Sequence, residues 1–152
     1  MLRRIAAFAI AVAIMVTLGS AAHSYFVQQA WSQAAGWAGG TGQGALPFTD
    51  RISWAAHDVV GMIKSYGALT VIALLIAFLA AGAVTRLTGN RTVVFGAGGA
   101  VAVFLMFTAL RTFIGTVFIF GARGASGLAT QMAVGLIAGV VFARLTTPLA
   151  RR

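Results

Sequence analysis

The residues of this chain whose types could support catalysis or metal binding are few. Asp50 and Asp58 are the only acidic side chains among 152 residues, and the chain contains two histidines, no glutamate and no cysteine. The absence of cysteine excludes thiolate metal ligands and thiol nucleophiles. The sequence also holds no HExxH, GxSxG or P-loop motif. We therefore expect a non-enzymatic protein without a catalytic site, a metal site or a cofactor.

Arg111 is the ionisable residue that lies furthest inside an apolar segment. A charge at membrane depth is costly and indicates a functional site if a partner exists. If the helix continued to Phe120, Arg111 would lie about 13 Å below its outer end, and Asp58 would be the candidate counter-charge in an ion pair between two helices. Asp58 could instead pair with a basic residue of its own helix or face water. If the segment ends near Thr112, Arg111 extends to the lipid headgroups, and both interpretations stay open.

The two histidines raise the question of a haem held between helices. His23 ends the first apolar segment and His57 precedes the second, and membrane helical bundles can hold haem between facing histidines. One crossing takes about 20 residues. Counting that many residues outward from Arg4 places His23 near the outer boundary of the membrane. The same count from Arg86 ends well before His57, which would therefore lie outside the membrane. The predicted difference in depth argues against haem and leaves it as a minor alternative.

Three further polar residues are candidates for a polar path or a helix contact. Gln131 lies on a stripe of small residues and can donate a hydrogen bond across a helix interface, worth about 0.6 kcal/mol in bilayers. Arg123 lies in the glycine-rich segment 121–127, whose composition fits either an anion-binding loop at a helix N-terminus or, as we prefer, a tight turn. The complete set of ion-pair or polar-path candidates is Asp58, Tyr66, Arg111, Arg123 and Gln131.

The elements that must position these residues follow from the composition. The chain is 60% hydrophobic and 9% charged, with a mean hydropathy of +0.95, whereas soluble domains carry about 25% charged residues. Apolar segments long enough for one helical crossing each predict an all-α integral membrane four-helix bundle forming a single domain, 1–152. The expected spans are residues 5–22, 66–84, 93–112 with a possible extension to 120, and 125–144.

The long connection between the first two spans, residues 23–64, is the most polar part of the chain. Five glycines between residues 36 and 44, followed by Pro47, predict a flexible segment that ends in a turn. Thr49 or Asp50 is a suitable N-cap for a partly amphipathic helix that leads into the second span. We expect this connection to lie along the outer membrane surface.

The orientation follows from the basic residues that flank the spans. When successive ends of the spans are assigned alternately to the two sides of the membrane, seven basic residues lie on one side and four on the other. Because basic residues are retained on the cytoplasmic side, this predicts a multi-pass protein of the cytoplasmic (inner) membrane with both termini cytoplasmic. A cleavable signal peptide, suggested by Arg3, Arg4 and the small residues 20–22, is the competing interpretation of the first segment. The group of seven is Arg3, Arg4, Arg86, Arg91, Arg144, Arg151 and Arg152.

Glycine is the main device by which these helices could pack. The chain has 19 glycines, and small residues allow the close backbone contact that holds helices together in lipid. The predicted packing faces could meet another helix of the same chain, a second copy or a different subunit. They comprise Gly96 and Ala100 in the third span and Gly124, Gly127, Gly135 and Gly139 in the last.

The expected partners are the lipid bilayer and either further copies of the chain or other membrane subunits. A net charge of +9 does not indicate nucleic-acid binding, because the basic residues flank apolar segments instead of forming one polar face. The arginines could favour anionic lipid headgroups. The sequence favours a structural or accessory subunit that associates through its glycine-rich faces. The alternatives are a small channel or transporter with a path around Arg111 and Asp58, and a haem-binding subunit using His23 and His57.

Overall fold

The computed structural model is all-helical over the residues that it describes, which are 1–37, 47–115 and 122–147. A π-helical turn, η1, joins α2 to α3, so that residues 48–88 form one uninterrupted helical segment. Four helical segments are long and apolar enough to cross a membrane. The elements are α1 (Leu2–Trp37), α2 (Phe48–Met62), η1 (Ile63–Gly67), α3 (Ala68–Thr88), α4 (Arg91–Ile114) and α5 (Ala125–Thr146).

The helical segments differ in length in a way that matters for a bilayer. At about 1.5 Å per residue, the 36 residues of α1 span about 54 Å and the 41 residues from Phe48 to Thr88 span about 60 Å. By the same rule, the 24 residues of α4 and the 22 residues of α5 span about 36 Å and 33 Å. Only the last two match a hydrocarbon core of about 30 Å.

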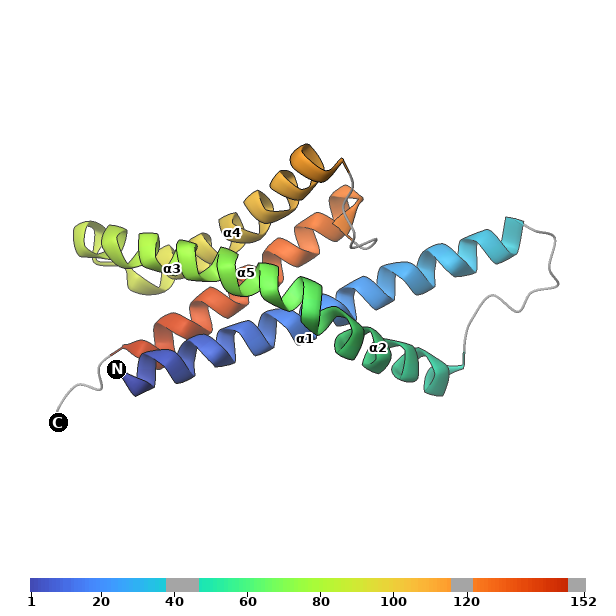
Figure 1. Cartoon of the computed structure of the whole chain (residues 1–152), viewed down its shortest axis with the longest axis horizontal. Coiled ribbons are helices and arrows are strands. Elements are labelled where there is room, and N and C mark those ends of the chain that lie inside the picture. The colour runs from blue at the N-terminus through green and yellow to red at the C-terminus, as the bar shows by residue number, and fades with distance from the viewer. Residues whose placement is uncertain (38–46, 116–121, 148–152) are drawn as a thin grey trace.

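The excess length forms a projection that we call the helical arm, made of residues 24–37 of α1 together with α2. Figure 1 shows α1 and α2 extending past the ends of α4 and α5, on the side away from the N-terminus. The predicted connection 23–64 therefore differs from the structure, because α1 stays helical to Trp37 and α2 begins at Phe48. Pro47, with no side-chain hydrogen bond, occupies the N-cap position predicted for Thr49 or Asp50.

The end of α4 separates the two interpretations of the third span. The helix ends at Ile114, where Gly115 adopts a left-handed conformation with φ of 76°. This conformation commonly terminates helices and favours glycine. The described helix favours the interpretation in which the third span ends near Thr112, with Arg111 in the last turn of α4. Residues 116–120, on which the extension to Phe120 depends, lie outside the described residues.

Glycines bring α4 and α5 into backbone contact. A Cβ added at Gly99 would overlap the carbonyl oxygen of Gly135, and one added at Gly139 would overlap the carbonyl oxygen of Phe95. At Gly96 the added atom would lie 3.0 Å from a Val140 methyl group. Gly135 and Gly139 of the glycine face of α5 are thus packed against α4 of the same chain, whereas a Cβ at Gly124 would meet nothing within 4 Å.

An aromatic cluster fills the end of the bundle that holds the N-terminus. Phe142 of α5 stacks on Phe78 of α3 with 4.5 Å between ring centroids, and Phe95 of α4 and Phe8 of α1 contact the same Phe78 ring. Arg3 adds polar contacts at the same end of the bundle. Its guanidinium donates to the carbonyl oxygens of Leu145 (2.8 Å) and Thr147 (2.7 Å). These bonds satisfy carbonyls at the end of α5 and join the first turn of the chain to the last helix.

Candidate functional site

A cluster of buried polar side chains lies where α1, η1, α3 and α5 meet. Each of its members is no more than 1% exposed, although the surrounding core is apolar. Buried polar groups are costly unless they are hydrogen-bonded, so their gathering at one place requires an explanation. We call this set the polar cluster, and it consists of Ser20, Ser24, Tyr66, Thr70 and Gln131.

Gln131 is the centre of the polar cluster because its amide joins three helical segments. The Tyr66 hydroxyl donates to Gln131 Oε1 at 2.8 Å. Gln131 Nε2 donates to the backbone carbonyl oxygen of Gly19 at 2.8 Å. Both ends of the amide are thus satisfied, and α1, η1 and α5 are fixed in one register.

Gly19 permits this arrangement by the absence of a side chain. A Cβ at position 19 would overlap the Tyr66 hydroxyl and lie 2.9 Å from Gln131 Oε1. Glycine is therefore required where the amide and the phenol approach the α1 backbone.

The π-helical turn is the local feature that presents Tyr66. A π turn inserts one residue into the helical repeat and changes the direction of the side chains near it, and such turns are frequent at functional sites. Both buried residues of η1, Tyr66 and Gly67, face inward. Tyr66 also stacks on Phe107 of α4, with ring centroids 6.4 Å apart and planes 16° apart.

Two hydroxyl groups of the polar cluster are not satisfied. Ser20 Oγ and Thr70 Oγ1 are buried without a hydrogen-bond partner. Thr70 lies beside the Tyr66 hydroxyl, which uses its proton on Gln131. The polar cluster therefore keeps unused hydrogen-bonding capacity next to a fully engaged amide.

The polar stripe continues along α1 into the helical arm. Gln28 Nε2 donates to Ser24 Oγ at 3.1 Å and to the carbonyl oxygen of Arg51 at 3.2 Å. Arg51 Nε returns a bond of 3.0 Å to Gln28 Oε1. This reciprocal pair joins α1 to α2 and holds the arm together where it leaves the bundle.

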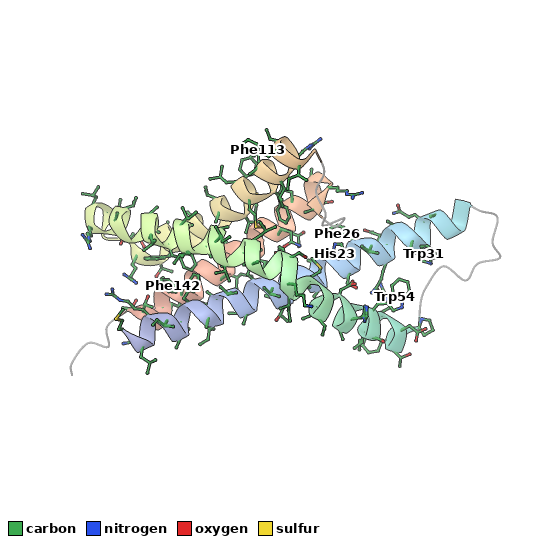
Figure 2. The ribbon with its side chains drawn as sticks, viewed as in Figure 1. His23, Phe26, Trp31, Trp54, Phe113 and Phe142 are labelled. Carbon is green, nitrogen blue, oxygen red and sulfur yellow. The ribbon has the colours of Figure 1, made fainter. Side chains whose placement is uncertain are left out.

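Charged residues gather beside the polar cluster, around His23. Figure 2 shows His23 on α1 near the point where the arm departs. It is half-buried, and the charges of Asp58 on α2 and Arg123 before α5 both act on it. His57 is exposed on α2, so the haem interpretation remains a prediction without support from a shared pocket.

Arg111 and Asp58 are not brought together in the described part of the chain. Arg111 is exposed and lines a hollow of about 630 Å³ with Thr108, Thr112 and Arg123, whereas Asp58 lies near His23. Of the ion-pair and polar-path candidates, Tyr66 and Gln131 are hydrogen-bonded to each other.

The remaining predicted positions lie on α4 and α5. Gly127 is buried and Ala100 is half-buried. Gly124 is the exposed N-cap residue of α5, and its carbonyl oxygen accepts a bond from Leu128 N–H at 2.9 Å. The segment 121–127 thus opens a helix, although Gly121 lies outside the described residues.

Sequence reasoning missed Ser20, Ser24, Gln28 and Thr70. The signal was present, because Ser20, Ser24 and Gln28 recur every four residues and therefore share one helical face. It was not used because the first span was expected to end at Ala22, whereas α1 continues beyond it.

These observations bear on the class of the protein. Four long apolar helical segments, packed through glycine contacts and one buried amide, are compatible with a polytopic helical membrane protein. Comparison with family models, with curated proteins and with solved structures gives no match to this chain. Any function must therefore be argued from the molecule itself.

Proposed function

We propose that the chain is a non-enzymatic accessory subunit of the cytoplasmic membrane, with both termini cytoplasmic and the helical arm on the outer side. The arm is the observation that carries this proposal. With one crossing taken as about 20 residues, a second crossing from Arg86 to Tyr66 leaves Phe48 about 27 Å further along the helix. The distal part of the arm would therefore stand beyond the hydrocarbon core.

The arm exposes apolar side chains in that region. Trp31 is 62% exposed, Phe48 76% and Val60 70%, and Figure 2 shows Trp31 and Trp54 on its two helices. Large apolar side chains exposed outside the lipid are a feature of protein interfaces, where tryptophan and phenylalanine are enriched. The partner that fits this surface is a second protein subunit.

The central glycines of α4 and α5 do not offer an alternative surface for association. Gly99, Gly135 and Gly139 already pack α4 against α5, and a second copy could reach them only by separating these helices. Association through the glycine-rich faces is therefore replaced in this proposal by association through the arm.

Photo-crosslinking tests the proposed role of the arm. A benzoylphenylalanine at position 54 is expected to give a protein adduct in native membranes, because Trp54 projects from the arm. The matched control is the same probe at Ile76, which is 64% exposed on α3 and should face lipid. The mass of the adduct distinguishes a second copy from a different subunit. Absence of any protein adduct from the probe at position 54, or from the same probe placed at the exposed Trp31, would contradict the proposal.

The alternative of a small channel or transporter receives support only from the buried hydroxyls of Ser20 and Thr70. Against it, the Gln131 amide is engaged at both ends and Arg111 is exposed at a helix end. Anion or proton flux in reconstituted vesicles that disappears in Arg111→Gln would favour transport over the subunit role.

A further inference from the structure

A hollow of about 800 Å³ lies at the end of the bundle that holds the N-terminus and the turn between α3 and α4. Residues of α1, α3, α4 and α5 form its walls. Its rim carries three arginines, Arg4, Arg86 and Arg91, and its apolar part includes Phe8, Leu75 and Leu79. We call it the arginine-rimmed hollow.

The rim concentrates positive charge without an acidic side chain to balance it. Arg4 and Arg91 are close enough for the charge of one to act on the other. The only acidic side chains of the chain are Asp50 and Asp58, and both belong to α2, which Figure 1 places away from the N-terminal end. Like charges brought together at one site favour an anion from outside the chain.

Arg91 is held in place and retains an unused donor. Its Nη2 donates to Thr146 Oγ1 at 2.6 Å, and its guanidinium carbon lies 4.6 Å from the centroid of the Phe95 ring. Its Nε is buried without a hydrogen-bond partner. A buried donor without an acceptor is rare in folded proteins, and Arg91 also lines the hollow, so its guanidinium keeps hydrogen-bonding capacity at this site.

The apolar part of the hollow distinguishes between possible anions. A free phosphate would need only the rim, whereas the hollow continues from the arginines over Phe8, Leu75 and Leu79. Charged groups at one end and an aliphatic and aromatic surface at the other match a molecule with an anionic head and a hydrocarbon tail. Basic pockets between transmembrane helices are typical sites for such lipids.

We propose that the arginine-rimmed hollow binds an anionic phospholipid, with its phosphate at Arg4, Arg86 and Arg91 and an acyl chain along Phe8, Leu75 and Leu79. This lipid site depends on the membrane placement that is part of the proposed function, but it does not depend on the arm or on its partner. Bound lipid would contact α1, α3 and α4 and would fix the end of the bundle where the chain begins.

Native mass spectrometry of the purified protein, with added phosphatidylglycerol or phosphatidylcholine, tests this site. We expect selective retention of phosphatidylglycerol. Arg4→Gln and Arg86→Gln should each weaken its retention about fivefold, as expected for one arginine near an anionic headgroup. The matched control is Arg144→Gln, which removes an exposed arginine from the last turn of α5 that does not line the hollow. It should leave retention unchanged.

Three outcomes would overturn the proposal. The first is equal retention of the two lipids, and the second is equal loss of retention in Arg86→Gln and Arg144→Gln. The third is thermal stabilisation by inorganic phosphate alone that matches stabilisation by phosphatidylglycerol, which would identify a free-phosphate site. Circular dichroism of each variant shows whether the helices are intact. The photo-crosslinking result at the arm is independent of all three, so the two proposals can fail separately.

Discussion

Gly99→Ala is expected to lower the free energy of unfolding by about 3 kcal/mol, the upper part of the range for overpacked cores. The added methyl group would meet the backbone carbonyl of Gly135, which cannot move without separating α4 from α5. Gly135→Ala and Gly139→Ala should act in the same direction, because their added atoms meet the backbone of Gly99 and Phe95. Unfolding in mixed micelles with increasing sodium dodecyl sulfate measures the effect.

Two neighbouring glycines provide matched controls for that prediction. A Cβ at Gly98 would lie 3.5 Å from Ala81 Cβ, an ordinary contact, and a Cβ at Gly82 would meet nothing within 4 Å. Gly98→Ala and Gly82→Ala should therefore be neutral, or stabilising by up to about 1 kcal/mol because alanine favours helix. If Gly99→Ala were as well tolerated as these two, the close contact between α4 and α5 would be refuted.

Gln131→Leu is expected to destabilise the protein by about 2 kcal/mol. The substitution leaves the buried Tyr66 hydroxyl without its acceptor, and an unsatisfied buried group costs about 1–3 kcal/mol. The Gly19 carbonyl oxygen also loses the bond from Gln131, but it lies within α1 and keeps the bond of its own helix. A single hydrogen bond in a bilayer contributes about 0.6 kcal/mol on average, so the unpaired hydroxyl dominates the expected loss.

The double variant Tyr66→Phe with Gln131→Leu tests whether these residues act as a unit. Tyr66→Phe alone should cost about 1 kcal/mol, and the double variant should cost less than the sum, since the second change removes a group that the first left unpaired. Thr130→Ala is the control, because Thr130 is exposed on α5 and bonds only within its own helix. Strictly additive losses would show that Tyr66 and Gln131 are not coupled.

Hydropathy predicted the parts of the fold that match the thickness of a bilayer. The expected spans 93–112 and 125–144 agree closely with α4 (Arg91–Ile114) and α5 (Ala125–Thr146). The arm was missed because hydropathy identifies apolar segments of membrane length but does not show whether a helix continues beyond them into more polar sequence. Residues 24–34 are too polar to predict a crossing, yet they are helical, with Ser24 and Gln28 buried and Gln28 hydrogen-bonded to Arg51 of α2.

The site was predicted as separate residues and not as a cluster. Tyr66 and Gln131 were both candidates, but their hydrogen bond depends on a π-helical turn and on the missing side chain of Gly19. Neither can be recognised from one sequence. The Asp58 and Arg111 pair was predicted because acidic residues are scarce and both residues were expected on the outer side, and neither argument determines the distance between them. The structure instead places Asp58 near His23.

The packing partner of the glycine faces is the third feature that the sequence left open. Spacing identifies a small-residue face, but it cannot show whether the facing helix belongs to the same chain. The contacts of Gly99, Gly135 and Gly139 assign that role to α4 and α5 themselves. The surface that we propose for a protein partner is the arm, where Trp31, Phe48 and Trp54 are exposed.

Single-cysteine labelling with a membrane-impermeant maleimide in intact cells tests most directly whether the bundle spans the bilayer with the arm outside. The natural chain has no cysteine, so each variant carries one reactive position. We expect Ser53→Cys on the arm to label from outside, and Thr88→Cys at the end of α3 to label only after permeabilisation. Ile76→Cys should label in neither condition. Labelling of Thr88→Cys from outside, or equal labelling of all three variants, would contradict this arrangement.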